Sequence, residues 1–354
     1  MKRKNAMRAK LKLVLVECLS SFVIAAIVYL IFKSAWWTVL VFCLLFVLTM
    51  IQPGLMVLDR LVKRTNWYKS RLADGWKFRK DIPCELDICN MGSNSGKYAF
   101  DYEGTGLKGE NWAVGPQTLS YDFRILKNYF SYLKEGATVL LPLCPFSGCI
   151  KDFEEEDINQ KYYSFLHPKL ILNFSQETKK DVMHFVDNPF QHTPYVSFKR
   201  LIRDYPYIDT QKEVSDGKFL EKDAEHWINC WMEQFSITDL NATVSEQNKE
   251  NIRYNADLLR EIVAFCQERN LRPVMVLPPV TKVLSNKFSD TFRENYIYSM
   301  IRNATDGHVL FLNYLDDERF SKSDLFFDAY FLNKKGSRIF TDLVLNDLKL
   351  TVYV

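Results

Sequence analysis

The first sixty residues carry the longest apolar stretches of the chain. Residues 13–32 are almost wholly apolar, and after a short break at Lys33 a second apolar run extends over residues 36–58. A helix that crosses a membrane needs about 20 apolar residues, so each run is long enough for one crossing. A signal peptide has a shorter apolar core and then a cleavage site, whereas here a second apolar run follows at once. The pattern predicts a two-helix transmembrane hairpin over residues 1–58.

Beyond residue 80, apolar runs of strand length alternate with segments of helix length. The expected strands are Leu86–Asn90, Asn111–Val114, Thr138–Leu143, Pro273–Leu277 and Val309–Asn313. Several are continuous apolar runs, which is typical of strands buried on both faces of a parallel sheet. Apolar residues at helical spacing predict helices over 118–133, 245–269, 292–301 and 335–348. The alternation predicts a doubly wound α/β fold with a five-stranded parallel sheet.

One interval interrupts this alternation. Residues 150–244 separate the third expected strand from the fourth and are rich in aromatic and charged residues. Such an insert in an α/β domain often covers the carboxyl ends of the strands, where ligands bind. The alternative is a helical extension that packs away from any site. The expected organisation is therefore the hairpin, a basic linker over 59–80, and one domain over 81–354 that contains this insert.

Charge is distributed unevenly along the chain. Residues 1–80 carry 15 lysines and arginines against three acidic residues, which leaves 31 basic and 40 acidic residues for 81–354. An acidic main domain lacks the basic footprint of nucleic-acid binding, so no nucleic-acid partner is expected. The basic excess lies beside the apolar runs, where lipid headgroups and topology use it. Both flanks of the hairpin are basic and its loop carries only Lys33, so a multi-pass membrane protein with a cytoplasmic main domain is expected.

The cysteines indicate neither a disulfide framework nor a zinc site. Six of them lie in the main domain with mostly apolar neighbours, which is typical of buried free thiols in a reducing compartment. Cys144 and Cys149 are a weak metal or redox signal, because they are five residues apart with a proline and a glycine between them. The chain also lacks a P-loop and a dinucleotide-binding glycine motif. No metal and no cofactor are therefore expected.

Candidate chemistry lies in the loops that follow the expected strands. These loops meet at the carboxyl edge of a parallel sheet, where function is usually carried. The sequence MGSNSG follows the first strand, and DAYFLNKKGSRIFT precedes the last expected helix. The glycine and the polar residues that these loops supply are Ser93, Asn94, Ser95, Gly115, Asp328 and Asn333.

The loops resemble those of the SGNH/GDSL hydrolase-like superfamily. The resemblance covers roughly residues 86–348 and rests on four features in order: NMGSNSG, the glycine after the second strand, the five-strand rhythm, and DAYFLNKKGSRIFT. More narrowly, the chain is similar to the membrane-anchored bacterial branch, which includes DltD-like and polysaccharide acyl-transfer proteins. The resemblance implies a three-layer α/β/α domain and acyl or acetyl ester chemistry on envelope polysaccharides. Proteins of that branch mostly act outside the cytoplasmic membrane, whereas the charge pattern places this domain inside.

Two positions depart from the family pattern. The nucleophilic serine of the family stands where this chain has Asn94, and the family's histidine stands where it has Phe331. A serine hydroxyl needs a base within hydrogen-bond reach, and a phenylalanine ring neither accepts nor donates a proton. The resemblance therefore implies a degenerate or altered catalytic site.

The first hypothesis is an enzyme with displaced catalytic groups. The nucleophile is then Ser95 or Ser93, and Asp328 orients a base. Because position 331 supplies no base, one of the five histidines has to do so. His192, in the insert, lies in the most loop-like sequence of these. The enzyme would be an SGNH-type esterase or acyltransferase.

The second hypothesis is a binding protein without catalysis. Glycine, serine and asparagine suit a strand-to-helix turn, and the amides of such a turn bind anions unaided. Asp328 then only caps the turn before the last helix. Under the first hypothesis, Asn94 and Gly115 are the expected hydrogen-bond donors to an oxyanion. Asn333 is a further binding candidate. Beside the lipid bilayer, the expected partner is a glycan, an acyl donor or a membrane acyltransferase.

Overall fold

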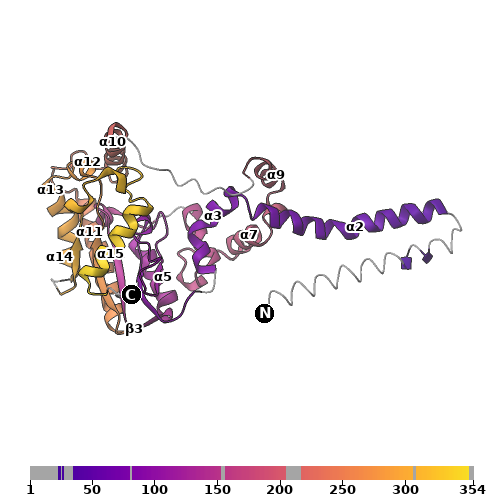
Figure 1. Cartoon of the computed structure of the whole chain (residues 1–354), viewed down its shortest axis with the longest axis horizontal. Coiled ribbons are helices and arrows are strands. Elements are labelled where there is room, and N and C mark those ends of the chain that lie inside the picture. The colour runs from indigo at the N-terminus through magenta and orange to yellow at the C-terminus, as the bar shows by residue number, and fades with distance from the viewer. Residues whose placement is uncertain are drawn as a thin grey trace. The chain divides into compact units, whose positions relative to one another are not determined.

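The structure, a computed structural model, describes residues 23, 24, 26, 27, 35–79, 82–152, 156–204, 217–305 and 308–350 (Figure 1). The chain divides into two compact units. A helical unit comprises Met1–Leu72 and Lys179–Asp209, and an α/β unit comprises Ala73–Thr178 and Thr210–Val354. Part of the 150–244 interval therefore packs with the N-terminal helices, and the rest belongs to the α/β unit.

The α/β unit contains a five-stranded parallel sheet, which confirms the α/β class and the sheet predicted from the sequence. The strands are β1 Leu86–Asn90, β2 Gly109–Asn111, β3 Leu133–Pro142, β4 Arg272–Leu277 and β5 Phe311–Asn313. They are all parallel and lie in the order β2-β1-β3-β4-β5. β2 and β3 pair with opposite edges of β1, so the strand order reverses direction between β1 and β3. The carboxyl ends of β1 and β3 thus form the switch point, where open α/β sheets bind ligands.

The second strand differs from its prediction. The expected strand was Asn111–Val114, but β2 ends at the first of these residues and the next three form a buried loop. The loop still follows the end of β1, because Trp112 N donates to Asn90 O (2.8 Å) and Val114 N donates to Gly92 O (3.0 Å). Tertiary packing rather than a strand ladder therefore explains why these apolar residues are buried.

The predicted helices of the α/β unit are present within a few residues. Three of them begin after a side chain that accepts a hydrogen bond from the third helical amide: Thr118, Ser245 and Asn333. The helices that they precede are α5 Leu119–Tyr129, α11 Glu246–Gln267 and α15 Lys334–Asp347. The expected helix over 292–301 is formed by α13 Asp290–Phe292, a π-helical segment Arg293–Tyr298 and α14 Ser299–Thr305.

Further helical segments complete the α/β unit. The α-helices among them are α4 Asn94–Ala99, α6 Glu156–Asn159, α10 Gly217–Gln234 and α12 Lys282–Ser285. The 3-10 segments are Lys77–Arg79, Phe130–Tyr132, Ser147–Cys149, Gln160–Ser164, Pro168–Leu170, Glu318–Phe320 and Ser323–Leu325.

Helices cover both faces of the sheet. On one face, Ile88 and Leu140 pack in a buried cluster with Phe340 of α15 and residues of α4. On the other face, Cys89 lies close enough to Cys266 of α11 for the two thiols to interact electrostatically. The seven cysteines in the described part of the chain are free thiols.

The helical unit is organised around α2, which comprises Ala35–Val62. By length and composition, this helix contains a candidate membrane span over Val39–Val62 with a mean hydropathy of 2.3. Its 24 residues extend about 36 Å, more than the roughly 30 Å of a bilayer's hydrocarbon core. The other predicted crossing, 13–32, lies almost entirely outside the described residues. The two-helix hairpin and the cytoplasmic orientation therefore remain predictions.

A buried carboxylate joins the insert to α2. Asp59 Oδ1 accepts a hydrogen bond from Phe190 N (2.8 Å), and Oδ2 accepts one from Gln191 Nε2 (2.7 Å). Near the end of α2, Tyr68 OH donates to Val186 O (2.6 Å). The remaining helices are α3 Asn66–Trp76, α7 Gln176–Asp187, α8 Pro189–His192 and α9 Pro194–Arg203.

Removal of this carboxylate should release α8 and α9 from α2. Asp59→Ala leaves the buried amide of Phe190 without its acceptor, at an expected cost of about 1–3 kcal/mol. Hydrogen exchange of the full chain in detergent should then quicken in residues 188–203 and remain unchanged in the sheet. Asp59→Asn, which retains one oxygen acceptor, should show a smaller effect. Equal exchange in all three proteins would contradict the role assigned to Asp59.

Candidate functional site

The turn after β1 begins with a glycine in the left-handed region. Gly92 has a φ of +107°, a conformation that side chains with a Cβ rarely adopt. Ser93 follows as the residue that precedes α4, and its Oγ accepts a hydrogen bond from Gln117 N (3.0 Å). The Ser93 hydroxyl thus ties the turn after β1 to the loop after β2.

Asn94 and Gly115 are in direct contact. A Cβ built on Gly115 would lie 1.6 Å from Asn94 Oδ1 and 2.5 Å from Asn94 Cγ. Only glycine allows this approach, because any other residue would overlap the carboxamide. The two residues that the sequence assigns to an oxyanion are therefore together, and the Asn94 carboxamide occupies the space beside Gly115.

Ser95 lines a small cavity at the carboxyl ends of the strands. The side chain is buried, and the cavity beside it has a volume of about 10 Å³, room for about one water molecule. Pro145 after β3, Pro278 after β4 and Phe331 before α15 form parts of its wall. No histidine of the described residues lines this cavity.

Tyr330 is a site residue that sequence reasoning missed. Its side chain lies close enough to those of Ser95 and Cys144, which come from α4 and from the loop after β3, for both to affect its pKa. Burial, followed by the neighbouring Cys144, raises the pKa of Tyr330 well above its ordinary value of 10. The hydroxyl stays protonated at neutral pH, so it cannot take a proton from Ser95. The only sequence signal was its place in the DAYFLN segment.

Phe331, at the family's histidine position, lies in a cluster of aromatic rings. Its ring centroid is 5.0 Å from that of Tyr98, 5.5 Å from that of Trp227 and 4.4 Å from that of Tyr330. Trp227 belongs to α10, and the next turn of this helix places Trp231 4.9 Å from Tyr330. This part of the insert therefore packs against the loop before α15, behind two residues that line the cavity.

Asp328 uses its carboxylate within its own loop. Oδ1 accepts hydrogen bonds from Tyr330 N (2.8 Å) and Phe331 N (2.6 Å). Burial raises the pKa of Asp328 to about 6 against the opposing effect of these two bonds, and the nearby Asp223 raises it further. Asp223 itself accepts from Ala329 N (2.8 Å). The Asp328 carboxylate thus shapes the loop, which is the structural role that the sequence offered as an alternative.

The other two predicted site residues have structural partners away from the cavity. Asn333 precedes α15, where its Oδ1 accepts from Gly336 N (3.0 Å) and its Nδ2 donates to Asp324 O (2.8 Å). His192 belongs to the helical unit, and its Nε2 lies 2.8 Å from Asp181 Oδ1. Neither side chain lines the cavity beside Ser95.

Asp122 of α5 is the second site residue that sequence reasoning missed. Its carboxylate supports the turn after β1. Asp122 is buried, and its Oδ1 accepts hydrogen bonds from Gly92 N (2.8 Å) and from Gln117 Nε2. Burial raises the pKa of Asp122 to about 7, and these hydrogen bonds only partly oppose it. The sequence signal was an acidic residue within the apolar face of LSYDFRIL. Both buried carboxylates of the site are therefore occupied by backbone amides.

The assembled groups offer hydrogen-bond donors but no available base. The side chains of Ser95 and Cys144 lie near the protonated hydroxyl of Tyr330. Among the described residues, no group of three His, Cys, Asp or Glu side chains is arranged to hold a metal ion. The geometry therefore suits binding of a small polar group better than removal of a proton from serine.

The contact between Asn94 and Gly115 can be tested by substitution. Gly115→Ala forces a methyl group into the Asn94 carboxamide, and we expect a loss of about 1–3 kcal/mol in the free energy of unfolding. The backbone at Gly115 is not left-handed, so the collision is the cause. Asn94→Ala/Gly115→Ala should recover most of the loss in denaturant unfolding. A double variant as unstable as Gly115→Ala would show that the contact is not the source.

The raised pKa of Asp122 predicts a pH dependence of stability. The folded protein holds this proton up to about pH 7, whereas the unfolded chain releases it near the ordinary value of 3.8. The folded state binds more protons in this window, so this group's contribution to stability falls as pH rises through it. Asp122→Asn keeps an acceptor for Gly92 N and does not titrate.

Denaturant unfolding of both proteins at about pH 5 and about pH 8 measures this effect. The stability of Asp122→Asn relative to the wild-type protein should be greater at the higher pH. All other titrating groups are common to the two proteins and cancel in the comparison. A difference that does not change with pH would contradict a raised pKa at Asp122.

Comparisons with known proteins add no family to this picture. A scan against protein-family models finds no match to the chain, and a search of curated proteins finds none either. The resemblance to SGNH hydrolase-like proteins therefore rests on the motifs described above. A five-stranded α/β fold alone does not specify a function, because many unrelated activities use such folds.

Proposed function

We propose that this chain is a membrane-anchored, SGNH hydrolase-like protein that no longer cleaves esters and acts by binding in the modification of bacterial envelope polysaccharides. The observation that carries the proposal is the environment of Phe331. An aromatic ring stands where the resemblance requires a base, and it packs against Tyr98, Trp227 and Tyr330. A site built this way has exchanged proton transfer for apolar packing.

The arrangement of the motifs supports the SGNH-like part of the proposal. The turn after β1, the glycine after β2 and the segment before α15 are distant in sequence. They converge through the contact of Asn94 with Gly115 and through the cavity that Ser95 and Tyr330 both line. Helices on both faces of the sheet are consistent with a three-layer α/β/α domain of this type.

An altered enzyme is the second candidate, and one observation favours it. Ser95 and Tyr330 both line the cavity, so a hydroxyl and a protonated donor lie together. The missing component is a base: Tyr330 is protonated, and the Asp328 carboxylate is bound to two backbone amides. This imbalance favours the binding function over catalysis by Ser95 or Ser93.

The membrane part of the proposal rests on α2 and the apolar run before it. We propose that 13–32 and 36–58 cross the membrane as a hairpin, with both basic flanks and the main domain on the cytoplasmic side. The bound partner would be a glycan or an acyl-carrying protein, such as a membrane acyltransferase. The aromatic side chains that line the cavity, Tyr330 and Phe331, suit the apolar face of a sugar or an acyl chain.

Active-site labelling of the full chain in detergent tests the proposal. The wild-type protein should neither react with a small fluorophosphonate nor hydrolyse an acetyl ester, because no base activates a serine. Asn94→Ser/Phe331→His restores both family positions and should gain labelling, whereas each single substitution should not. Thermal unfolding of the four proteins provides the folding control.

Two results would contradict the proposal. Labelling of the wild-type protein that Ser95→Ala or Ser93→Ala abolishes would identify an enzyme with a base from elsewhere. A folded Asn94→Ser/Phe331→His variant that does not react would count against the SGNH-like assignment itself. Labelling of the double variant also shows that the reagent can enter the site. Absence of labelling in the wild-type protein then reflects an unreactive serine and not a blocked entrance.

A further inference from the structure

Helix α9 of the helical unit has a clearly defined inner face. Ser197 is fully buried, and its Oγ donates a hydrogen bond to Pro189 O (2.9 Å). Leu201, one turn later, packs against the buried cluster that contains Val62 and Phe185. These contacts fix which side of the helix faces outward.

The outward face of α9 is apolar. The side chains of Tyr195, Phe198 and Ile202 are 80%, 58% and 71% exposed. They occupy positions i, i+3 and i+7, so they form one stripe along the helix. Single exposed apolar residues are ordinary on a protein surface, whereas a contiguous group of large ones marks an interaction site.

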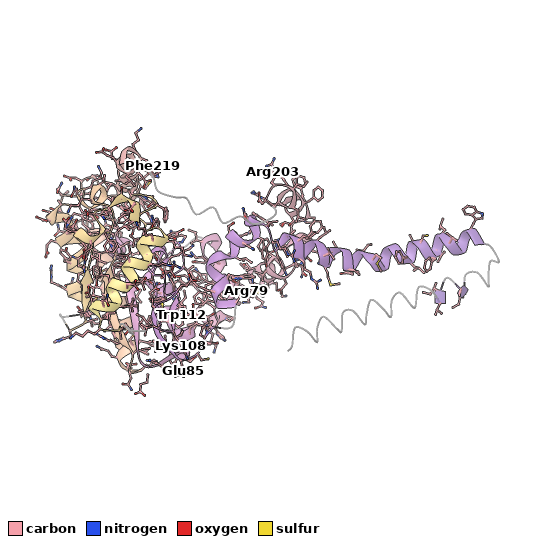
Figure 2. All side chains as sticks on the ribbon, viewed as in Figure 1. Arg79, Glu85, Lys108, Trp112, Arg203 and Phe219 are labelled. Atoms are coloured by element: carbon pink, nitrogen blue, oxygen red, sulfur yellow. The ribbon has the colours of Figure 1, made fainter. Side chains whose placement is uncertain are left out.

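Cations accompany this stripe. Lys199 and Arg203 are exposed one turn apart, on the side of the helix next to the stripe. Figure 2 shows Arg203 at the end of α9. The helix contains no acidic residue, and Asp204 just after it pairs with Arg200 (3.2 Å). An apolar stripe with lysine and arginine beside it is the composition of helices that lie in the interface of a membrane.

The position of α9 relative to α2 agrees with such a location. The buried Asp59 carboxylate holds the start of α8, and α9 follows α8 directly. Asp59 lies three residues before the end of the candidate span Val39–Val62, about 5 Å along the helix axis. If α2 crosses a bilayer, the end of its apolar span marks the level of the lipid headgroups, and α9 is attached at that level.

We propose that α9 is an interfacial membrane helix. Tyr195, Phe198 and Ile202 enter the boundary between headgroups and acyl chains, while Lys199 and Arg203 contact anionic headgroups. The insert thereby gives the helical unit a second membrane contact beside α2. The proposal rests on the membrane anchoring proposed above and is independent of whether the α/β unit catalyses a reaction.

Photocrosslinking of the full chain in lipid nanodiscs tests this contact. p-Benzoylphenylalanine replaces one phenylalanine at a time: Phe198 on α9, Phe46 on α2, and Phe219 on α10. All three side chains are about half exposed on helices, at 58%, 48% and 50%, and Figure 2 marks Phe219 on the α/β unit. Mass spectrometry then measures the lipid adduct at each position after illumination.

We expect position 198 to form lipid adduct at a yield comparable to position 46 and several-fold above position 219. Replacing part of the phosphatidylcholine by phosphatidylglycerol should increase the yield at position 198. Lys199→Gln/Arg203→Gln should remove that increase, because the anionic lipid then loses its cationic partners.

The controls separate the two proposals. Adduct at position 46 without adduct at position 198 overturns the role of α9 and leaves the anchor intact. Absence of lipid adduct at both positions overturns the anchoring by α2 and with it the interfacial helix. A crosslink from position 198 to a second copy of the chain, or equal lipid yields at positions 198 and 219, also overturns the inference.

Discussion

The candidate site depends on a buried carboxylate that binds backbone rather than substrate. Asp122 accepts hydrogen bonds from Gly92 N and the Gln117 side chain, and Gln117 N in turn donates to Ser93. These bonds hold the loop after β1 and the loop after β2 in one arrangement. The approach of Asn94 to Gly115 requires this arrangement, because the two residues come from different loops. Burial of Asp122 raises its pKa to about 7, so the arrangement has an electrostatic cost.

The part of the site before α15 is organised by the aromatic packing of Phe331. Phe331 gains its stability from neighbouring rings, and those rings come from α4, α10 and its own loop. Trp227 and Trp231 of α10 pack against Phe331 and Tyr330, and these two residues line the cavity of about 10 Å³. The insert therefore supports the wall of the cavity from behind.

The helical unit is also held together by a buried carboxylate. Asp59, like Asp122, is a buried carboxylate that accepts hydrogen bonds from backbone and amide groups distant in sequence. It attaches the α8–α9 part of the insert to the end of α2, and the apolar stripe of α9 is exposed as a result. One insert thus serves two units: α10 supports the wall of the cavity, and α9 carries the surface proposed to meet lipid.

The sequence by itself determined the features that depend on neighbouring residues. Alternating apolar runs predicted the five-stranded parallel sheet, including the bounds of β1 at Leu86–Asn90. The helix starts at residues 118 and 245 were predicted well, because Thr118 and Ser245 cap amides only three residues away. Asn333 was expected to bind a ligand, but it caps α15. The end of β2 was misplaced, because burial of Trp112 by the fold resembles the burial of a strand residue.

Only the tertiary structure decided which residues form the site. The proximity of Tyr330 to Ser95, the pKa of Asp122 and the packing of Trp227 against Phe331 each join segments far apart in the chain. The same holds for His192, which a sequence pattern offered as a base and the fold places beside Asp181 in the helical unit. Local patterns encode secondary structure through short-range sterics and hydrogen bonds, whereas a site depends on long-range packing that no short segment specifies.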